Sequence, residues 1–170
     1  AFAEYAINQG YQVVVTARRK DKLEEIKALA PTQVEAVKMD VNNDDDVHIA
    51  VKQALARFGN IDVLINNAGY GILGAVEETP EEELRAQLET NFFGAVKVTR
   101  ALLPHFRDQR FGAIVNISSM GGQMSFAGFG AYSASKFALE GLSEALAGEL
   151  MPFGIKVLIV EPGSFRTDLM

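Results

Sequence analysis

A recurring unit of helix, glycine and strand constrains the fold of this 170-residue chain more than any other feature. Four times, a helix-like segment ends in a glycine that is closely followed by a β-branched, apolar run. The glycines are Gly10, Gly59, Gly112 and Gly154, and the runs are residues 11–16, 61–66, 113–118 and 155–161. Glycine often ends a helix in the left-handed conformation. The pattern therefore predicts helices that alternate with strands.

A further predicted strand, residues 34–40, also follows a helical segment. Strands that alternate with helices need crossover connections, so the sheet should be parallel. The runs show little polar alternation, which is expected where helices cover both faces of a sheet. With no repeat, low-complexity tract or linker between, we expect an α/β fold in a single domain over residues 1–170.

Composition narrows the function classes. The chain has no cysteine, which excludes disulfides, thiolate metal sites and a cysteine nucleophile. Its net charge of −6 argues against a nucleic-acid partner. The apolar run at residues 157–160 is far shorter than the roughly 20 residues of a membrane span, and His48 and His105 have no second ligand at metal spacing. We expect a soluble, cytoplasmic protein without a metal.

Two long helices carry clear signatures. Thr79, Pro80 and Glu82 predict an N-cap, a first-turn proline and a capping-box acid for the first helix. The second runs over residues 131–150 and has a stripe of small residues that includes Ala138, Gly141, Ala145 and Gly148. Small residues allow another backbone to come close, so this stripe faces either the sheet or a second subunit.

The residues that suggest chemistry follow strand ends or lie on these helices. Tyr132 and Lys136 are four apart on a helix and project from one face, although this spacing alone is common. Ser119 follows the run 113–118, and strand ends of open α/β sheets are where ligands bind. Asn91 lies in an apolar helical stretch, where a buried amide needs a partner.

Together these residues resemble the short-chain dehydrogenase/reductase family. The resemblance covers essentially the whole chain, with five motifs in the family's order and spacing. They are Asn66-Asn67-Ala68-Gly69, Asn91, Ile117-Ser118-Ser119, Tyr132-x-x-x-Lys136 and Pro162-Gly163-x-x-x-Thr167. It implies a Rossmann-like, doubly wound parallel sheet and an NAD(P)-dependent oxidoreductase.

The resemblance also implies a role for each site residue. Tyr132 would be the general acid or base at the substrate oxygen, and Ser119 would hydrogen-bond the same oxygen. Lys136 would bind the nicotinamide ribose hydroxyls and favour the phenolate of Tyr132. Asn91 would hold a water that links the lysine to a proton relay.

Cofactor residues follow from the same comparison. Where a relative that prefers NAD usually has an acidic residue, this chain has Ala17, followed by Arg18, which suits the 2′-phosphate of NADP. Alternatively, Arg18 and Arg19 only open the next helix. The other residues expected to contact the cofactor are Asp40, Val41, Asn67, Ala68, Gly69, Tyr132, Lys136, Pro162, Gly163 and Thr167.

Two parts of the family pattern are missing. The chain has no Gly-rich turn between a first strand and first helix, and it ends before a substrate loop and a last strand. The missing first strand would lie between residues 11–16 and 61–66 in the sheet. We therefore expect an incomplete sheet and a fragment that has little stability or activity alone.

Several functions remain open on the sequence. The leading hypothesis is hydride transfer between NADP(H) and a small apolar carbonyl or secondary alcohol. Alternatives are a non-catalytic NADP sensor, an inactive fragment, and an epimerase or dehydratase. The side chains left to line the substrate side are Tyr70, Gln123, Met124, Phe126 and Phe129. In the family, the two long helices form a four-helix bundle between subunits, which implies a homodimer or homotetramer.

Overall fold

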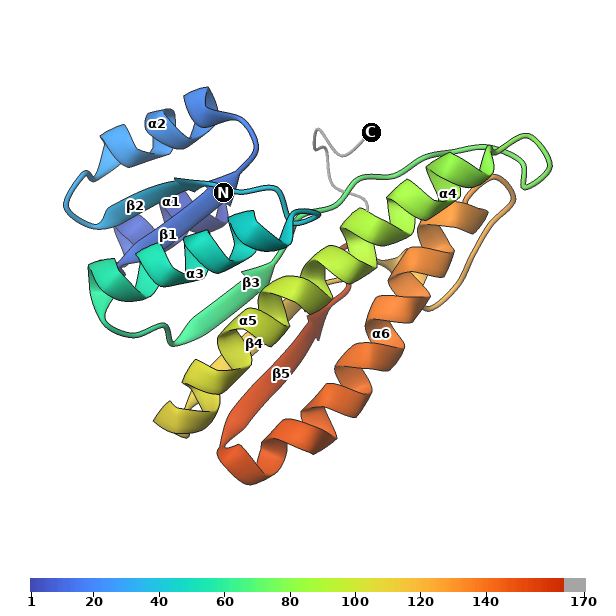
Figure 1. Ribbon diagram of the computed structural model, residues 1–170. Coiled ribbons are helices and arrows are strands. Elements are labelled where there is room, and N and C mark those ends of the chain that lie inside the picture. Colours follow the sequence, from blue (N-terminus) through green and yellow to red (C-terminus); the bar gives the residue numbers. More distant parts are fainter. Residues whose placement is uncertain (164–170) are drawn as a thin grey trace. The chain divides into compact units, whose positions relative to one another are not determined.

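The computed structural model describes residues 1–163 and shows the alternation of helices and strands that the sequence predicts (Figure 1). The chain divides into two compact units, residues 1–61 and 62–170. That residues 1–170 form a single domain stays a prediction. Thr167 lies outside the described residues.

The first unit packs three helices against a two-stranded sheet. Its elements are α1 (Phe2–Asn8), β1 (Val13–Ala17), α2 (Lys20–Leu29), β2 (Val34–Lys38) and α3 (Asp44–Phe58). The strands are parallel, with Val13 opposite Val34 and Ala17 opposite Lys38. The buried core comprises Leu23, Val34, Val37, Met39, Val47, Ala50 and Ala54.

The second unit contains the other strands in a parallel sheet of order β3-β4-β5. Its strands are β3 (Val63–Asn66), β4 (Gly112–Ile117) and β5 (Ile155–Val160), and its helices are α4 (Glu81–Leu88), α5 (Gly94–Gln109) and α6 (Gly130–Leu150). A π-helical turn, η1 (Glu89–Phe93), joins α4 to α5, and short 3₁₀ turns η2 (Met120–Gly122) and η3 (Met151–Phe153) flank α6.

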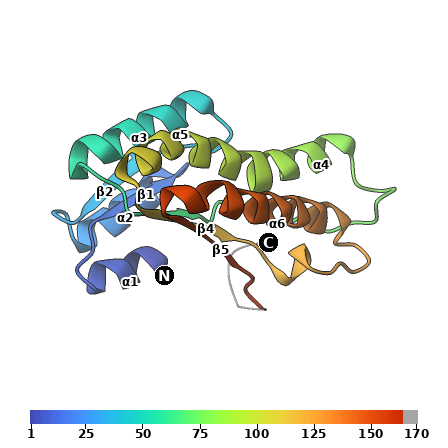
Figure 2. The ribbon, with the colours of Figure 1, turned by 90° about the horizontal axis from the view of Figure 1, so that it is seen from below.

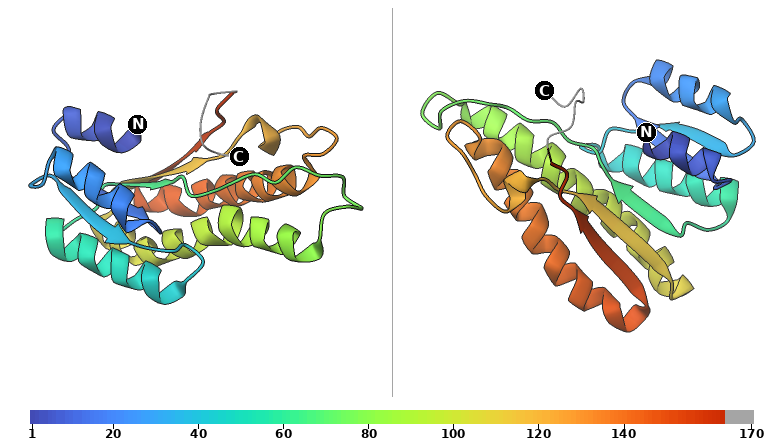
Figure 3. Two further views of the ribbon diagram at one scale, coloured as in Figure 1. Left: turned by 90° about the horizontal axis from the view of Figure 1, so that it is seen from above. Right: turned by 180° about the vertical axis from the view of Figure 1, so that it is seen from behind.

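Helices cover one face of this second sheet. In Figure 2, α4, α5 and α6 lie on the same side of the strands, and Figure 3 shows the strands uncovered from behind. The side chains of Val63, Ile65 and Leu158 are accordingly 51%, 43% and 55% exposed. The sequence predicts helices on both faces of the sheet. Within the described residues of this unit, helices cover only one face.

Three of the four predicted glycine turns are confirmed. Gly10, Gly59 and Gly154 have φ angles of 81°, 82° and 74°. The fourth prediction is wrong, because Arg110 takes the left-handed conformation that ends α5. Gly112 instead begins β4, where a Cβ would lie 2.6 Å from Cδ1 of Phe106. A close approach of the Phe106 ring, rather than helix termination, explains this glycine.

The predicted helix starts agree within two residues, with one difference in detail. Thr79 does not cap α4, because its hydroxyl donates to the carbonyl of Ala75 at 2.9 Å. Pro80 has extended backbone angles and occupies the cap position before Glu81. The carboxylates of the first turn then interact with the positive end of the helix dipole.

The small-residue stripe of α6 does not face the sheet. Gly141, Ala145 and Gly148 are exposed, and a Cβ on either glycine would meet nothing within 4 Å. The opposite side of α6 is buried through residues that include Leu139, Ser143, Leu146 and Leu150. Of the two sides that the sequence left open, the sheet side is excluded.

Among the described helices, none is both long and apolar enough to span a bilayer.

Candidate active site

Parallel strands place their carboxyl ends at one edge of the second sheet. Asn66, Ile117 and Val160 end β3, β4 and β5, so the segments that follow them leave from the same edge. These segments contain residues 67–72, 118–122 and 161–163. This is the edge where open α/β sheets bind ligands.

Side-chain amides tie this edge together below the site. Nδ2 of Asn66 donates to Oδ1 of Asn116 at 2.8 Å and to Oγ1 of Thr99 at 3.0 Å. Nδ2 of Asn116 in turn donates to Oγ of Ser143 on α6 at 2.8 Å. Asn66 thus ties the end of β3 to β4 and to α5 through its side-chain amide.

Lys136 joins α6 directly to the end of β4. Its Nζ donates to the carbonyl oxygen of Ile117 at 2.8 Å, and the residue is only 6% exposed. Burial lowers the pKa of the Lys136 ammonium to about 8, and the charge of Glu140 partly opposes this decrease. An ammonium has three donors. In the described part of the chain one of them is used, which leaves two for a ligand's hydroxyl groups.

Ser119 and Tyr132 meet around the backbone of Gly121. A Cβ at Gly121 would lie 3.1 Å from Cε1 of Tyr132 and 3.5 Å from Oγ of Ser119. The Ser119 hydroxyl accepts a hydrogen bond from the Gly121 amide at 3.1 Å. Nζ of Lys136 lies 5.8 Å from the centre of the Tyr132 ring. The structure therefore brings together the three residues that the sequence placed in one site.

Asn91 lies in the π-helical turn and is fully engaged by its neighbours. Its Nδ2 donates to the Tyr70 carbonyl at 2.9 Å and to Oγ of Ser135 at 3.0 Å, and its Oδ1 accepts from the Tyr70 amide at 3.0 Å. The expectation that a buried amide here has a partner is confirmed. A Cβ on Gly69 would lie 3.0 Å from Oδ1 of Asn91 and 3.8 Å from Nζ of Lys136, so glycine is needed for this close approach.

Gln87 is a site residue that the sequence reasoning missed. It is completely buried one helical turn before Asn91. Its Oε1 accepts from the Ile72 amide at 3.0 Å, and its Nε2 donates to the carbonyl of Tyr70. The segment that it holds packs on Tyr132, since a Cβ on Gly71 would lie 3.4 Å from the Tyr132 ring. In the sequence, the feature that could have identified Gln87 is its spacing of four residues from Asn91 in a helical segment.

The other predicted cofactor residues lie at strand ends in their own units. In the first unit, Arg18 directly follows β1, is exposed, and makes no hydrogen bond or ion pair with other described residues. Oδ1 of Asp40 accepts from the Asn42 amide at 3.0 Å after β2, and Val41 is half-buried. In the second unit, Asn67 and Ala68 are exposed after β3, and Pro162 and Gly163 follow β5.

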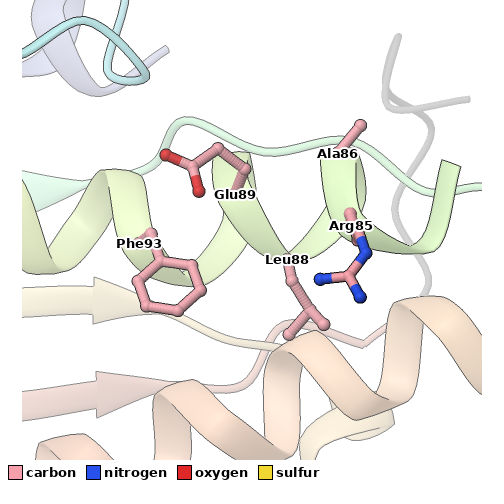
Figure 4. A pocket seen from close by; sticks show the side chains of 5 residues that line it. All are labelled: Arg85, Ala86, Leu88, Glu89 and Phe93. Carbon is pink, nitrogen blue, oxygen red and sulfur yellow. The ribbon is translucent and has the colours of Figure 1, made fainter. Parts of the chain in front are cut away.

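A shallow hollow elsewhere on the second unit is unrelated to these groups. It is lined by Arg85, Ala86, Leu88, Glu89 and Phe93 (Figure 4). Figure 4 shows the side chains of Arg85 and Leu88 pointing toward α6. None of the lining residues is one of the predicted site residues, so the hollow is not where Tyr132 would act.

Burial of Lys136 makes the free energy of unfolding depend on pH. Its pKa falls from 10.5 to about 8 on folding, so between these values the unfolded chain binds more protons and stability rises with pH. Between pH 8 and 9.5, the wild type should gain about 1.6 kcal/mol of stability relative to Lys136→Met. Urea unfolding at each pH measures it. Exposed Lys156→Met is the control, and a pH-independent difference for Lys136→Met would contradict the prediction.

The comparisons with known proteins agree with this geometry. The family model described as short chain dehydrogenase matches residues 1–170. A 3-ketodihydrosphingosine reductase of Bacteroides thetaiotaomicron is 47% identical over 166 residues, which is 97% of this chain and 59% of that protein. The chain thus spans about three fifths of the length of this curated relative.

Solved structures of similar proteins hold both kinds of nicotinamide cofactor. The structure of ElxO with NADP bound has a TM-score of 0.91 and 30% identity, covering 98% of this chain and 68% of ElxO. A 3-ketoacyl-(acyl-carrier-protein) reductase from Brucella melitensis complexed with NADH has a TM-score of 0.95 and 31% identity, covering 98% of this chain and 71% of that chain. With the family model matched from end to end and the Ser119, Tyr132 and Lys136 side chains at one sheet edge, the chain belongs to the short-chain dehydrogenase family.

Proposed function

We propose that the protein transfers a hydride between NADP(H) and a carbonyl or secondary alcohol, with Tyr132 as the general acid or base. The observation that carries this proposal is the convergence of Ser119 and Tyr132 around Gly121, with the Lys136 ammonium 5.8 Å from the tyrosine ring. A cofactor sensor that catalyses nothing has no need for this set of side chains.

Residues of the chain itself supply and accept the proton that is transferred to or from the substrate oxygen. In the reducing direction, the Tyr132 hydroxyl donates its proton to the substrate oxygen, and in the oxidising direction the phenolate takes it back. The Ser119 hydroxyl donates a hydrogen bond to the same oxygen. The nearby positive charge of Lys136 stabilises the phenolate, and its low exposure of 6% keeps water from screening that charge.

A nicotinamide cofactor fits the donors at this edge. When bound, it supplies or accepts the hydride. The two remaining donors of Lys136 would bind its ribose hydroxyls, and the segments at residues 67–69 and 162–163 would border its nicotinamide half. In the first unit, the guanidinium of Arg18 after β1, which has no partner among the described residues, suits a 2′-phosphate, and Asp40 and Val41 suit the adenine side. This supports NADP over NAD.

Apolar side chains beside the site support an apolar substrate. Met124, Phe126 and Phe129 are 52%, 61% and 36% exposed on the segment between η2 and α6. A backbone hydrogen bond of 2.9 Å from the Gly74 amide to the Gly128 carbonyl joins this segment to the one after β3. The Bacteroides relative is, by its name, a reductase of a sphingoid ketone. The lack of cysteine also fits a cytoplasmic site of action.

The role of Tyr132 is tested by removing one oxygen. Tyr132→Phe in the full-length protein should lower kcat by about 10²- to 10⁴-fold, because no other group donates the proton, while the Kd for NADPH changes little. Steady-state kinetics on a panel of apolar ketones and calorimetry measure the two quantities. Near-normal turnover by the variant would show that Tyr132 is not the acid or base.

Cofactor choice is tested at the end of β1. Ala17→Asp should weaken NADPH binding more than tenfold, or about 1.4 kcal/mol, because the new carboxylate repels the 2′-phosphate. NADH use should improve relative to NADPH. The control is Thr16→Ser, at an exposed position of the same strand. Ala68→Asp would not serve as a control, because Ala68 lies in the other unit. Equal affinity of the unaltered protein for both cofactors in calorimetry would refute the preference for NADP.

We further propose that the full-length protein is a homodimer or homotetramer through α4, α5 and α6. The exposed stripe at Gly141, Ala145 and Gly148 supports this, as do Phe93 and Phe137, each 47% exposed. Gly141→Arg should give a folded monomer, because a long cation would prevent close helix packing. Light scattering measures the mass, and a monomeric wild type at micromolar concentration would refute the assembly.

A further inference from the structure

Glu140 is a buried carboxylic acid that the proposed chemistry does not use. It lies one helical turn after Lys136 on α6 and is only 6% exposed. Its Oε1 has no hydrogen-bond partner among the described residues. A buried carboxylate is costly unless a positive charge or a donor lies close to it. The burial of Glu140 therefore needs a compensating interaction or a function.

The neighbours of Glu140 belong to the turn that carries Ser119. A Cβ on Gly122 would lie 2.8 Å from Oε1 of Glu140 and 2.7 Å from Oγ of Ser118. Both oxygens thus border the same glycine at the end of η2. The Ser118 hydroxyl is also buried without a partner among the described residues, so the two oxygens flank Gly122 without a hydrogen bond between them.

Lys136, one helical turn before Glu140 on α6, is a buried cation that interacts electrostatically with it. Of the charged groups on the described residues, Glu140 is the one that opposes the effect of burial on the Lys136 ammonium. The elements packed around Lys136 contribute the Ile117 carbonyl from β4 and Asn91 from η1, which are not ionisable. On the same helix, Tyr132 is an ionisable group close to Lys136, whose Nζ lies 5.8 Å from the centre of the tyrosine ring. At this end of the sheet, strand β5 places Val160 opposite Ile117, and valine is not ionisable.

We propose that Glu140 is a positioning residue for the active site, whose buried carboxylate keeps Lys136 in its ammonium form and anchors the Ser118–Gly122 turn that presents Ser119. The catalytic part of this inference rests on the function proposed above, because the charge of Lys136 matters there through Tyr132. Lys136 and Glu140, one helical turn apart on α6, lie against two successive parts of the chain at and after the end of β4. Lys136 binds the carbonyl of Ile117, and Glu140 borders the side chain of Ser118.

The direct test is the protonation of Lys136 in a variant that keeps the shape of Glu140 but removes its charge. In Glu140→Gln, the pKa of Lys136 should fall by about one unit further below 8. The readout is an NMR titration of ¹³Cε-labelled lysines in the full-length protein, with the signal assigned by its loss in Lys136→Met. Glu140→Asp should restore most of the shift. Exposed Glu144→Gln, one turn further along α6, is the matched control and should leave the Lys136 signal unchanged.

Activity provides the second readout. The alkaline limb of the pH profile of kcat/KM should move to lower pH by the same amount in Glu140→Gln. An unchanged midpoint in the NMR titration, or a shift equal to that of Glu144→Gln, would overturn the proposal. If the midpoint falls while Tyr132→Phe retains full turnover, the function proposed for Tyr132 is wrong and the effect of Glu140 on the charge of Lys136 stands.

A second variant keeps the proposal testable if Glu140→Gln does not fold. Gly122→Ala places a methyl group against Oε1 of Glu140 and Oγ of Ser118, so the carboxylate must move. The pKa of Lys136 should change in this variant as well. Gly148→Ala is the control, because its Cβ would meet nothing within 4 Å. An identical Lys136 midpoint in both glycine variants would contradict the contact between Glu140 and this turn.

Discussion

The hydrogen bond from Nζ of Lys136 to the carbonyl of Ile117 is the interaction on which the rest of the site depends. It fixes α6 to the last residue of β4, and thereby sets where Tyr132 lies relative to Ser119. Below it, Asn116 and Ser143 repeat the same connection deeper in the unit. Because the Lys136 donor is buried, loss of its acceptor would leave an unpaired group at a cost of about 1–3 kcal/mol.

The same burial links structure to chemistry. A desolvated ammonium acts strongly on nearby groups, because little water screens it, but it also tends to lose its proton. Burial lowers the pKa of Lys136 to about 8, so the ammonium and the neutral amine are close in free energy near neutral pH. Glu140 shifts the balance toward the charged form. The site is thus held by polar groups whose charge, as well as position, matters for the proposed reaction.

Much of the fold could be predicted because local signals agreed with tertiary structure. The strands and long helices follow from apolar runs and glycines, and Tyr132, Ser119 and Lys136 lie on a helix and after a strand, where spacing can be read. Gln87 escaped because its partners are the backbone groups of Tyr70 and Ile72, which approach it only in the folded chain. Gly112 was assigned the wrong role because its constraint is contact with the Phe106 ring, and this contact forms only when the chain is folded. The orientation of the small stripe on α6 required packing that the sequence does not contain.

The central claim is that this sheet edge performs hydride transfer between a nicotinamide and a carbonyl carbon. Its most direct measurement uses full-length protein, NADPH deuterated on the transferred position of nicotinamide C4, and an apolar ketone, with the product alcohol analysed by mass spectrometry and NMR. The account predicts one deuterium on the carbinol carbon of each product molecule. Alcohol that forms without deuterium on that carbon, from either deuterated face of the nicotinamide, would contradict it.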